Sequence, residues 1–237
     1  MLTAAAFVPS PPLLVPELNG LSAAETDDLR AAILDAGRSL SGTVEWIVVG
    51  AEQVEQTVPS TACGTFSGFG ADVPVRLGPD ADGEPDPGLP LPALVAGWIR
   101  DRTAPHVRVT THVVATDSDN SHCSELGRSL RARLDGDDLP RALLVVADGA
   151  ATLTAKAPGA YDPRSGDVEA ALADALATGD PVALGALDAD LCSQIRLDGR
   201  AAWDVLAGAF PAPPRSAQVT YCAAPYGVGY HVGIWTP

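Results

Sequence analysis

Two short, uninterrupted apolar runs constrain the fold of this chain more than any other feature. They are WIVVG at 46–50 and ALLVVA at 142–147. Strands buried on both faces have this pattern, whereas strands with one face in water alternate apolar and polar residues. Because stretches with helical periodicity separate these runs, the sequence predicts a layered α/β domain.

The other elements follow from periodicity and turn residues. We expect strands at 2–8, 46–50, 73–77, 107–115, 142–147, 219–223 and 229–235, and helices at 22–40, 90–102, 121–134, 168–178 and 201–210. Ser22, followed three residues later by Glu25, predicts a capping box at the start of the first helix. The segment 78–92 is rich in Pro, Gly and Asp, which is typical of a surface loop. Because the alternation resumes directly after it, we predict one domain over 1–237.

The charge balance excludes two classes of partner. The chain has 15 Lys and Arg against 30 Asp and Glu, a net charge of −15. Nucleic acids and anionic membranes both require a basic surface, so neither is expected to bind. The first residues lack a basic region, and prolines from Pro9 to Pro16 interrupt their apolar run. We therefore expect no signal peptide or membrane span, and a cytoplasmic location.

The four cysteines give no sign of a metal or disulfide framework. Cys63, Cys123, Cys192 and Cys222 are widely spaced and contain no CxxC pair. A structural zinc site or a disulfide scaffold normally needs closer or more numerous cysteines. For Cys222 we favour a buried, inert thiol over a nucleophile, because no histidine stands near it in the sequence.

A ligand site is expected beyond the carboxyl ends of the strands, where loops and helix N-termini converge in open α/β sheets. The segments that follow the expected strands are 9–12, 51–53, 148–152 and, if the last strands join the sheet, 222–229. The reactive side chains in these segments are Ser10, Glu52, Asp148, Thr152, Cys222 and Tyr226.

Several of these residues also have ordinary structural interpretations. Glu52 is typical of an exposed loop glutamate, and Asp148 of a residue that caps a turn. His112 and His122, ten residues apart around TDSDNS, match no metal motif and indicate a solvated loop. His231 alternates with its neighbours as a half-buried structural residue does. Gly227 and Gly229 favour a tight turn with positive φ.

Three blocks of the sequence resemble one family. They are PSPPLLVPELNG at 9–20, DGAATLTAKAPGAYDPRSGDVEAAL at 148–172 and VTYCAAPYGVGYHVG at 219–233. In order and spacing they are similar to the PHPP, GDLSH–YDPRG and closing APFGVGY blocks of the LigB-like class III extradiol ring-cleavage dioxygenases. The resemblance implies a single three-layer α/β/α domain with a central mixed sheet. It also implies Fe(II) held by two histidines and a glutamate, with a further histidine as acid and base.

The residues at the matching positions do not preserve that chemistry. The three histidine positions carry Ser10, Glu52 and Ala151, and the glutamate position carries Ala223. Only Asp148 of the GDLSH block remains. Losing a partner of a metal ligand already costs about 10–100-fold in affinity or activity. Because the ligands themselves are replaced here, we expect neither Fe(II) nor another cofactor, no catalytic residue and no ring cleavage.

Three hypotheses for function stay open. The first is a degenerate homologue of these dioxygenases, which binds a small neutral or aromatic ligand, or a protein, in the retained pocket; the family implies a homodimer. That pocket would contain the positions Ser10, Glu52, Asp148, Ala151, Cys222, Ala223 and Tyr226. The second is an active enzyme of the same family with a divalent metal, such as Mg²⁺ or Mn²⁺, on Glu52 and Asp148. The third is an interaction domain outside this family, marked by an exposed apolar patch without a pocket.

Overall fold

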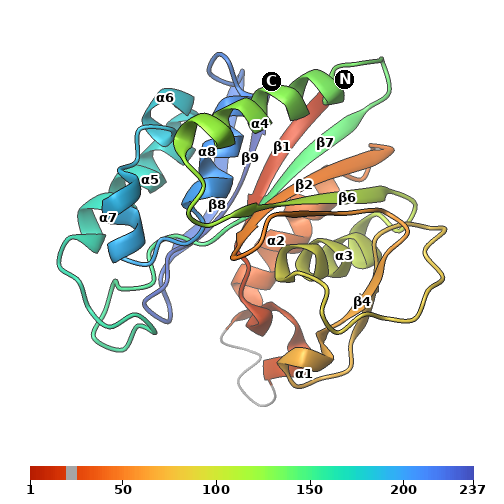
Figure 1. Cartoon of the computed structure of the whole chain (residues 1–237), viewed down its shortest axis with the longest axis horizontal. Helices are drawn as coiled ribbons and strands as arrows, with labels where there is room; N and C mark the ends of the chain where they lie inside the picture. Colours follow the sequence, from red (N-terminus) through yellow and green to blue (C-terminus); the bar gives the residue numbers. More distant parts are fainter. Residues whose placement is uncertain (20–25) are drawn as a thin grey trace.

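The structure, a computed structural model, describes residues 1–19 and 26–237. Its centre is a seven-stranded mixed sheet in the order β3-β6-β2-β7-β1-β9-β8 (Figure 1). The neighbouring strands β6, β2, β7 and β1 are parallel, whereas β9 runs antiparallel to both β1 and β8. A separate two-stranded sheet pairs β4 with β5. The described strands are β1 (Leu2–Val8), β2 (Glu45–Glu52), β3 (Gln56–Val58), β4 (Cys63–Thr65), β5 (Pro74–Arg76), β6 (Arg108–Ala115), β7 (Arg141–Val146), β8 (Ser216–Ala223) and β9 (Tyr230–Thr236).

Helices cover both faces of the large sheet, which confirms the expected three-layer α/β/α architecture with a mixed sheet. In Figure 1, α2 and α3 lie on one side, and α4 to α8 lie on the other. Short 3-10 turns at Pro12–Leu14 and Phe66–Phe69 add to the connections. The described α-helices are α1 (Pro16–Asn19), α2 (Asp27–Ser39), α3 (Leu91–Thr103), α4 (Asn120–Leu134), α5 (Ser165–Thr178), α6 (Pro181–Leu184), α7 (Ala189–Gln194) and α8 (Arg200–Ala209).

The run WIVVG forms the buried part of β2, as its composition predicts. Ile47 and Val49 point to the core under α4, α5 and α8, and Trp46 and Val48 point to the core under α2 and α3. All four side chains have no exposed surface. Because each face of the strand is covered by helices, neither face needs polar residues.

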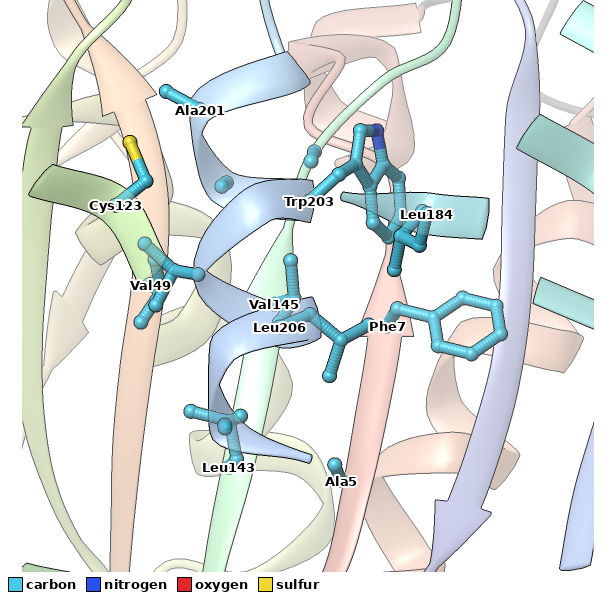
Figure 2. Close-up of a cluster of buried hydrophobic side chains, with 14 of the residues drawn as sticks. Ala5, Phe7, Val49, Cys123, Leu143, Val145, Leu184, Ala201, Trp203 and Leu206 are labelled. Carbon is cyan, nitrogen blue, oxygen red and sulfur yellow. The ribbon is translucent and has the colours of Figure 1, made fainter. Parts of the chain in front are cut away.

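Helix α8 packs aromatic and aliphatic side chains directly onto the sheet (Figure 2). Trp203 meets Phe7 of β1 edge to face, with ring centroids 5.9 Å apart. Leu206, one turn further along the helix, is also fully buried. Edge-to-face contacts match the positive edge of one ring to the negative face of the other. This packing fixes α8 close to the carboxyl end of β7, where Trp203 Nε1 donates to the carbonyl of Asp148.

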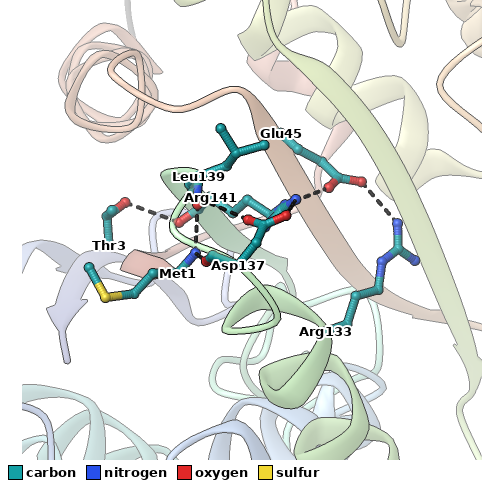
Figure 3. Close-up of polar contacts among 7 residues, drawn as sticks. All are labelled: Met1, Thr3, Glu45, Arg133, Asp137, Leu139 and Arg141. Carbon is teal, nitrogen blue, oxygen red and sulfur yellow. Dashed lines mark hydrogen bonds and ion pairs between the residues drawn. The ribbon is translucent and has the colours of Figure 1, made fainter.

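Ion pairs tie the amino ends of the parallel strands together (Figure 3). Arg141, at the start of β7, pairs with Asp137 and with Glu45 at the start of β2. Arg133 of α4 binds the other oxygen of Glu45 at 2.9 Å. The amino group of Met1 donates to the carbonyl of Leu139 at 2.5 Å. These contacts lie at the end of the sheet opposite to the expected ligand site.

The structure extends or adds several elements relative to the predicted ones. Strands β3 and β4 and helices α6 and α7 are not predicted, because segments of three to six residues carry too little periodicity. The capping box of Ser22 and Glu25 lies outside the described residues, and the helix described there is Asp27–Ser39. The two strands expected at the end of the chain are confirmed; they pair as a hairpin, and Gly227 in its turn has φ +75°.

Candidate ligand pocket

A cavity of about 180 Å³ lies at the carboxyl ends of β1, β2 and β7. Its wall includes Ser10 from the loop after β1, Glu52 from the end of β2, and Asp148 and Ala151 from the loop after β7. Val228, in the turn between β8 and β9, also lines it. The carboxyl ends of parallel strands meet here, so residues far apart in the sequence converge on one cavity.

Asp148 and Ser10 form the polar floor of this cavity. The backbone N–H of Ser10 donates to Asp148 Oδ1 at 2.7 Å, and Ser10 Oγ donates to Oδ2 at 2.9 Å. Burial raises the pKa of Asp148 to about 6, although both bonds from Ser10 oppose that rise. Asp148 therefore does not cap a turn of its own segment; its side chain joins two loops that are 138 residues apart.

Glu52 is the last residue of β2 and not an exposed loop residue, which corrects the structural interpretation of it. Its Oε1 accepts a hydrogen bond of 2.7 Å from the backbone N–H of Leu91, the first residue of α3. A carboxylate at this position satisfies one of the free donors of the helix start and interacts favourably with the helix dipole. The side chain is thus partly engaged in a structural contact while it lines the cavity.

A buried Glu–His pair directly behind this floor has no counterpart among the predicted site residues. His231 Nε2 of β9 lies 2.7 Å from Glu169 Oε1 of α5, and His231 is only 1% exposed. Glu169 Oε2 accepts from the N–H of Ala150, two residues after Asp148. The negative charge of Glu169 adds to the rise in the pKa of Asp148. His231 is therefore fully buried and paired, and not half-buried as its alternation indicates.

Two glycines, which have no side chain, provide the space that the Glu169–His231 pair occupies. A Cβ on Gly229 would lie 1.6 Å from Glu169 Oε1, and one on Gly149 would lie 2.4 Å from it. Only Gly227 of the hairpin turn has a positive φ. Gly229 is thus required by close approach of a side chain, and the expectation of positive φ at this position is wrong. The signal available in the sequence is the GVG string, but it does not reveal the distant glutamate.

The remaining predicted residues lie outside the cavity wall. Cys222 is exposed on β8, opposite His231 of β9, so the expectation of a buried thiol is wrong. Ala223 pairs with Tyr230 at the end of the hairpin, and Tyr226 packs against the core under α2 and α3. Thr152 is 2% exposed and donates to the carbonyl of Ile195. Neither Cys222, Ala223, Tyr226 nor Thr152 lines the cavity.

The histidines flanking TDSDNS are not in a solvated loop. His112 lies in β6 and pairs with Thr57 of β3, and His122 lies in the first turn of α4. Asp119 caps α4 by accepting from the backbone N–H of His122. Among the residues described by the structure, no group of three or more His, Cys, Asp or Glu is arranged to hold a metal ion. No described helix is long and apolar enough to cross a membrane.

The mouth of the cavity carries one ion pair. Arg196 Nη2 lies 3.9 Å from Asp198 Oδ2, and both side chains are more than half exposed. Such an exposed pair contributes about 0–1 kcal/mol to stability. With Glu52 and Asp148 inside the cavity, acidic groups outnumber the single arginine. The local charge therefore disfavours an anionic ligand.

Comparisons with known proteins bear on the fold alone. No protein-family model matches the sequence, and no curated protein matches it. The structure is similar to the crystal structure of an uncharacterized protein from Escherichia coli K12, with a TM-score of 0.63 and 14% sequence identity. The alignment covers 98% of this chain and 99% of that chain. The two folds are therefore alike over their whole length. At 14% identity, this likeness says nothing about ligands.

Proposed function

We propose that this protein is a homologue of the class III extradiol dioxygenases that has lost ring cleavage and binds a small neutral or aromatic ligand. The observation that supports this most is the convergence of the three family-like blocks on one cavity. Ser10 comes from the first block, Asp148 from the second and Val228 from the third, and all three line it. If the three blocks build one pocket, that pocket accounts for the family resemblance in all of them.

The residues in this cavity do not fit the Fe(II) that the resemblance implies. No histidine is among the described residues that line it. Ser10 and Ala151 supply a hydroxyl and a methyl group at two of the expected imidazole positions. Glu52 Oε1 and both oxygens of Asp148 already accept hydrogen bonds from the protein. Imidazole is the ligand that iron sites of this kind require, so the donor set differs in kind.

The volume and polarity of the cavity define the ligand. At about 180 Å³ the cavity is smaller than the roughly 300–1,000 Å³ of pockets for drug-sized ligands, so it suits a small ligand. The Asp148 carboxylate can accept a hydrogen bond from a hydroxyl or N–H group of the ligand, and the walls from Pro92 and Val146 would contact an apolar ring. Ligand pockets commonly combine mostly apolar walls with a few polar groups that orient the ligand.

Phenol and catechol are suitable probes for this proposal. We expect saturable chemical-shift changes in ¹H–¹⁵N spectra at residues around Ser10 and Asp148. Ala151→Leu places extra volume in the cavity and should abolish these changes. Ala132→Leu, the same substitution on the exposed face of α4, should leave them intact. Binding that is unaffected by Ala151→Leu, or no saturable binding of either probe, would contradict the proposal.

Anaerobic calorimetry with Fe(II), Mn²⁺ and Zn²⁺ on metal-stripped protein tests the alternative of an active metal enzyme. That alternative draws support from Glu52 and Asp148 lining the same cavity. We expect no saturable binding at micromolar metal. A stoichiometric site that disappears in Asp148→Ala would favour the metal-dependent enzyme instead.

A further inference from the structure

The loop after β7 is bonded through its backbone to the turn between β8 and β9. The N–H of Gly149 donates to the carbonyl of Gly229 at 2.8 Å, and the N–H of Gly229 donates to the carbonyl of Ala150 at 3.0 Å. Both segments line the ligand pocket, the loop through Gly149 and the turn through Val228. The shape of the pocket floor therefore depends on how these two segments are held together.

Glu169 reaches this junction from α5 and uses both of its carboxylate oxygens there. Oε2 accepts from the N–H of Ala150 at 2.8 Å, and Oε1 lies 2.7 Å from His231 Nε2. The side chain of Glu169 is 14% exposed and that of His231 is 1% exposed, so water competes little for these contacts. The carboxylate thus joins the loop after β7 to strand β9.

The surroundings of the imidazole determine which of its nitrogens carries the hydrogen. His231 Nδ1 is buried and has no hydrogen-bond partner among the described residues. A hydrogen on Nδ1 would therefore be a buried donor without an acceptor, which is rare in folded proteins. In the neutral ring it would also leave the Nε2 lone pair facing a carboxylate oxygen 2.7 Å away, although neither atom could then donate. A single hydrogen on Nε2 satisfies both atoms of the contact.

We propose that Glu169 and His231 are positioning residues for the ligand pocket. A neutral His231 donates its Nε2 hydrogen to Glu169, and Glu169, held in this way, fixes Ala150 and the loop that carries Asp148. The inference rests on the proposed ligand site and adds to it two residues that lie outside the cavity wall. Only a carboxylate suits this place, because it accepts on both sides, whereas an amide accepts through its single oxygen.

Glu169→Gln tests this two-sided acceptor without any ligand. The glutamine oxygen can accept from Ala150 or from His231, but not from both. At pH 7.5 we therefore expect one of two changes: the hydrogen of His231 moves to Nδ1, or the amide hydrogen of Ala150 exchanges about tenfold or more faster. Imidazole ¹⁵N shifts report the tautomer, and hydrogen exchange reports Ala150. Asp174→Asn, an acid-to-amide change on the exposed side of α5, should change neither.

Phenol binding tests the consequence for the pocket. Because the loop is no longer held, we expect Glu169→Gln to weaken phenol binding about three- to tenfold at pH 7.5 and Asp174→Asn to leave it unchanged. Asp148, with a pKa of about 6, is already largely ionised at this pH. The loss of affinity therefore reports the position of the Asp148 carboxylate and not its charge.

Three results would overturn the inference. One is a hydrogen on His231 Nδ1 in the wild-type protein at pH 7.5. The second is a Glu169→Gln variant in which neither the tautomer nor the exchange of Ala150 changes, and the third is unchanged phenol binding in that variant. If Glu169→Gln does not fold, the wild-type tautomer decides alone. If the wild type binds neither phenol nor catechol, the proposed function fails, whereas the ligand-free spectra still decide the roles of Glu169 and His231.

Discussion

At the scale of single residues, Asp148 shows how competing contacts set the chemistry of a pocket. Burial raises its pKa, two hydrogen bonds from Ser10 lower it, and the nearby carboxylate of Glu169 raises it again. The result, about 6, means that the group changes charge just below neutral pH. A ligand that donates a hydrogen bond to this carboxylate should therefore bind more tightly at pH 7.5 than at pH 5.

Substitutions on the two sides of Asp148 should move its pKa in opposite directions. Ser10→Ala removes a donor that stabilises the charged form, so the pKa of Asp148 should rise. Glu169→Gln removes a like charge, so the pKa should fall. Carboxyl ¹³C NMR titration measures both. Asp162, whose half-buried carboxylate is held at a pKa of about 2 by hydrogen bonds from Arg164, serves as an internal control. If the pKa of Asp148 moved in the same direction in both variants, Asp148 would not have the contacts with Ser10 and Glu169 described above.

At the scale of elements, the close contact of α4 and α8 depends on two glycines. A Cβ on Gly127 of α4 would lie 2.3 Å from the carbonyl oxygen of Val205. A Cβ on Gly208 of α8 would lie 2.5 Å from the carbonyl oxygen of Ser124. Backbone atoms cannot turn aside as side chains do, so a methyl group at either position requires the helices to separate. This contact also holds α8 in place, and with it Trp203 against Asp148.

Two alanine substitutions separate this packing effect from helix propensity. Gly127→Ala should lower the free energy of unfolding by about 1–3 kcal/mol, because the helices must move apart. Gly166→Ala in α5 meets no atom within 4 Å and should raise it by up to about 1 kcal/mol, because alanine favours the helix. Urea denaturation measures both values. Similar effects from the two substitutions would mean that α4 and α8 are not in close contact.

At the scale of the whole molecule, buried and exposed acids oppose one another in the dependence of stability on pH. Asp148 and Asp204 have pKa values of about 6 in the folded state, above the ordinary 3.8. Between pH 3.8 and pH 6 the folded state binds more protons at these two groups than the unfolded state does. Their contribution to stability therefore falls as the pH rises from about 4 to 6. Asp137 and Asp162, with pKa values of about 2, contribute stability above 3.8 that is lost as the pH falls toward 2. Stability should therefore be greatest near pH 4.

Thermal unfolding between pH 3 and pH 8 tests this maximum. We expect the Tm near pH 4.5 to exceed that at pH 7.5, and the net charge of −15 at neutral pH acts in the same direction. His112, whose pKa is lowered by burial, acts weakly in the opposite direction below pH 6.5. Asp148→Asn should reduce the fall in Tm between pH 4 and pH 6, whereas Asp162→Asn should change the Tm only below about pH 4. A Tm that rises steadily from pH 4 to 7.5 would contradict this balance of groups.

The local pattern of the sequence determined the layered architecture of this protein. WIVVG predicts a strand covered on both faces, and β2 is such a strand, because burial of consecutive side chains is recorded directly in consecutive residues. The expected strands at 2–8 and 229–235 are confirmed for the same reason, since most of their residues are buried in succession. The positions of Ser10, Glu52 and Asp148 at one end of the sheet also follow, since parallel strands bring their carboxyl ends together.

The partners and exposure of the polar groups were decided only by the tertiary structure. Glu169 and His231 are 62 residues apart, and no short-range periodicity links them. Cys222 is exposed because β8 is the edge strand, and the sheet order depends on which strands pair across long distances in the chain. Periodicity indicates which face of an element is apolar, whereas the packing of distant segments decides how far each residue is covered and by what.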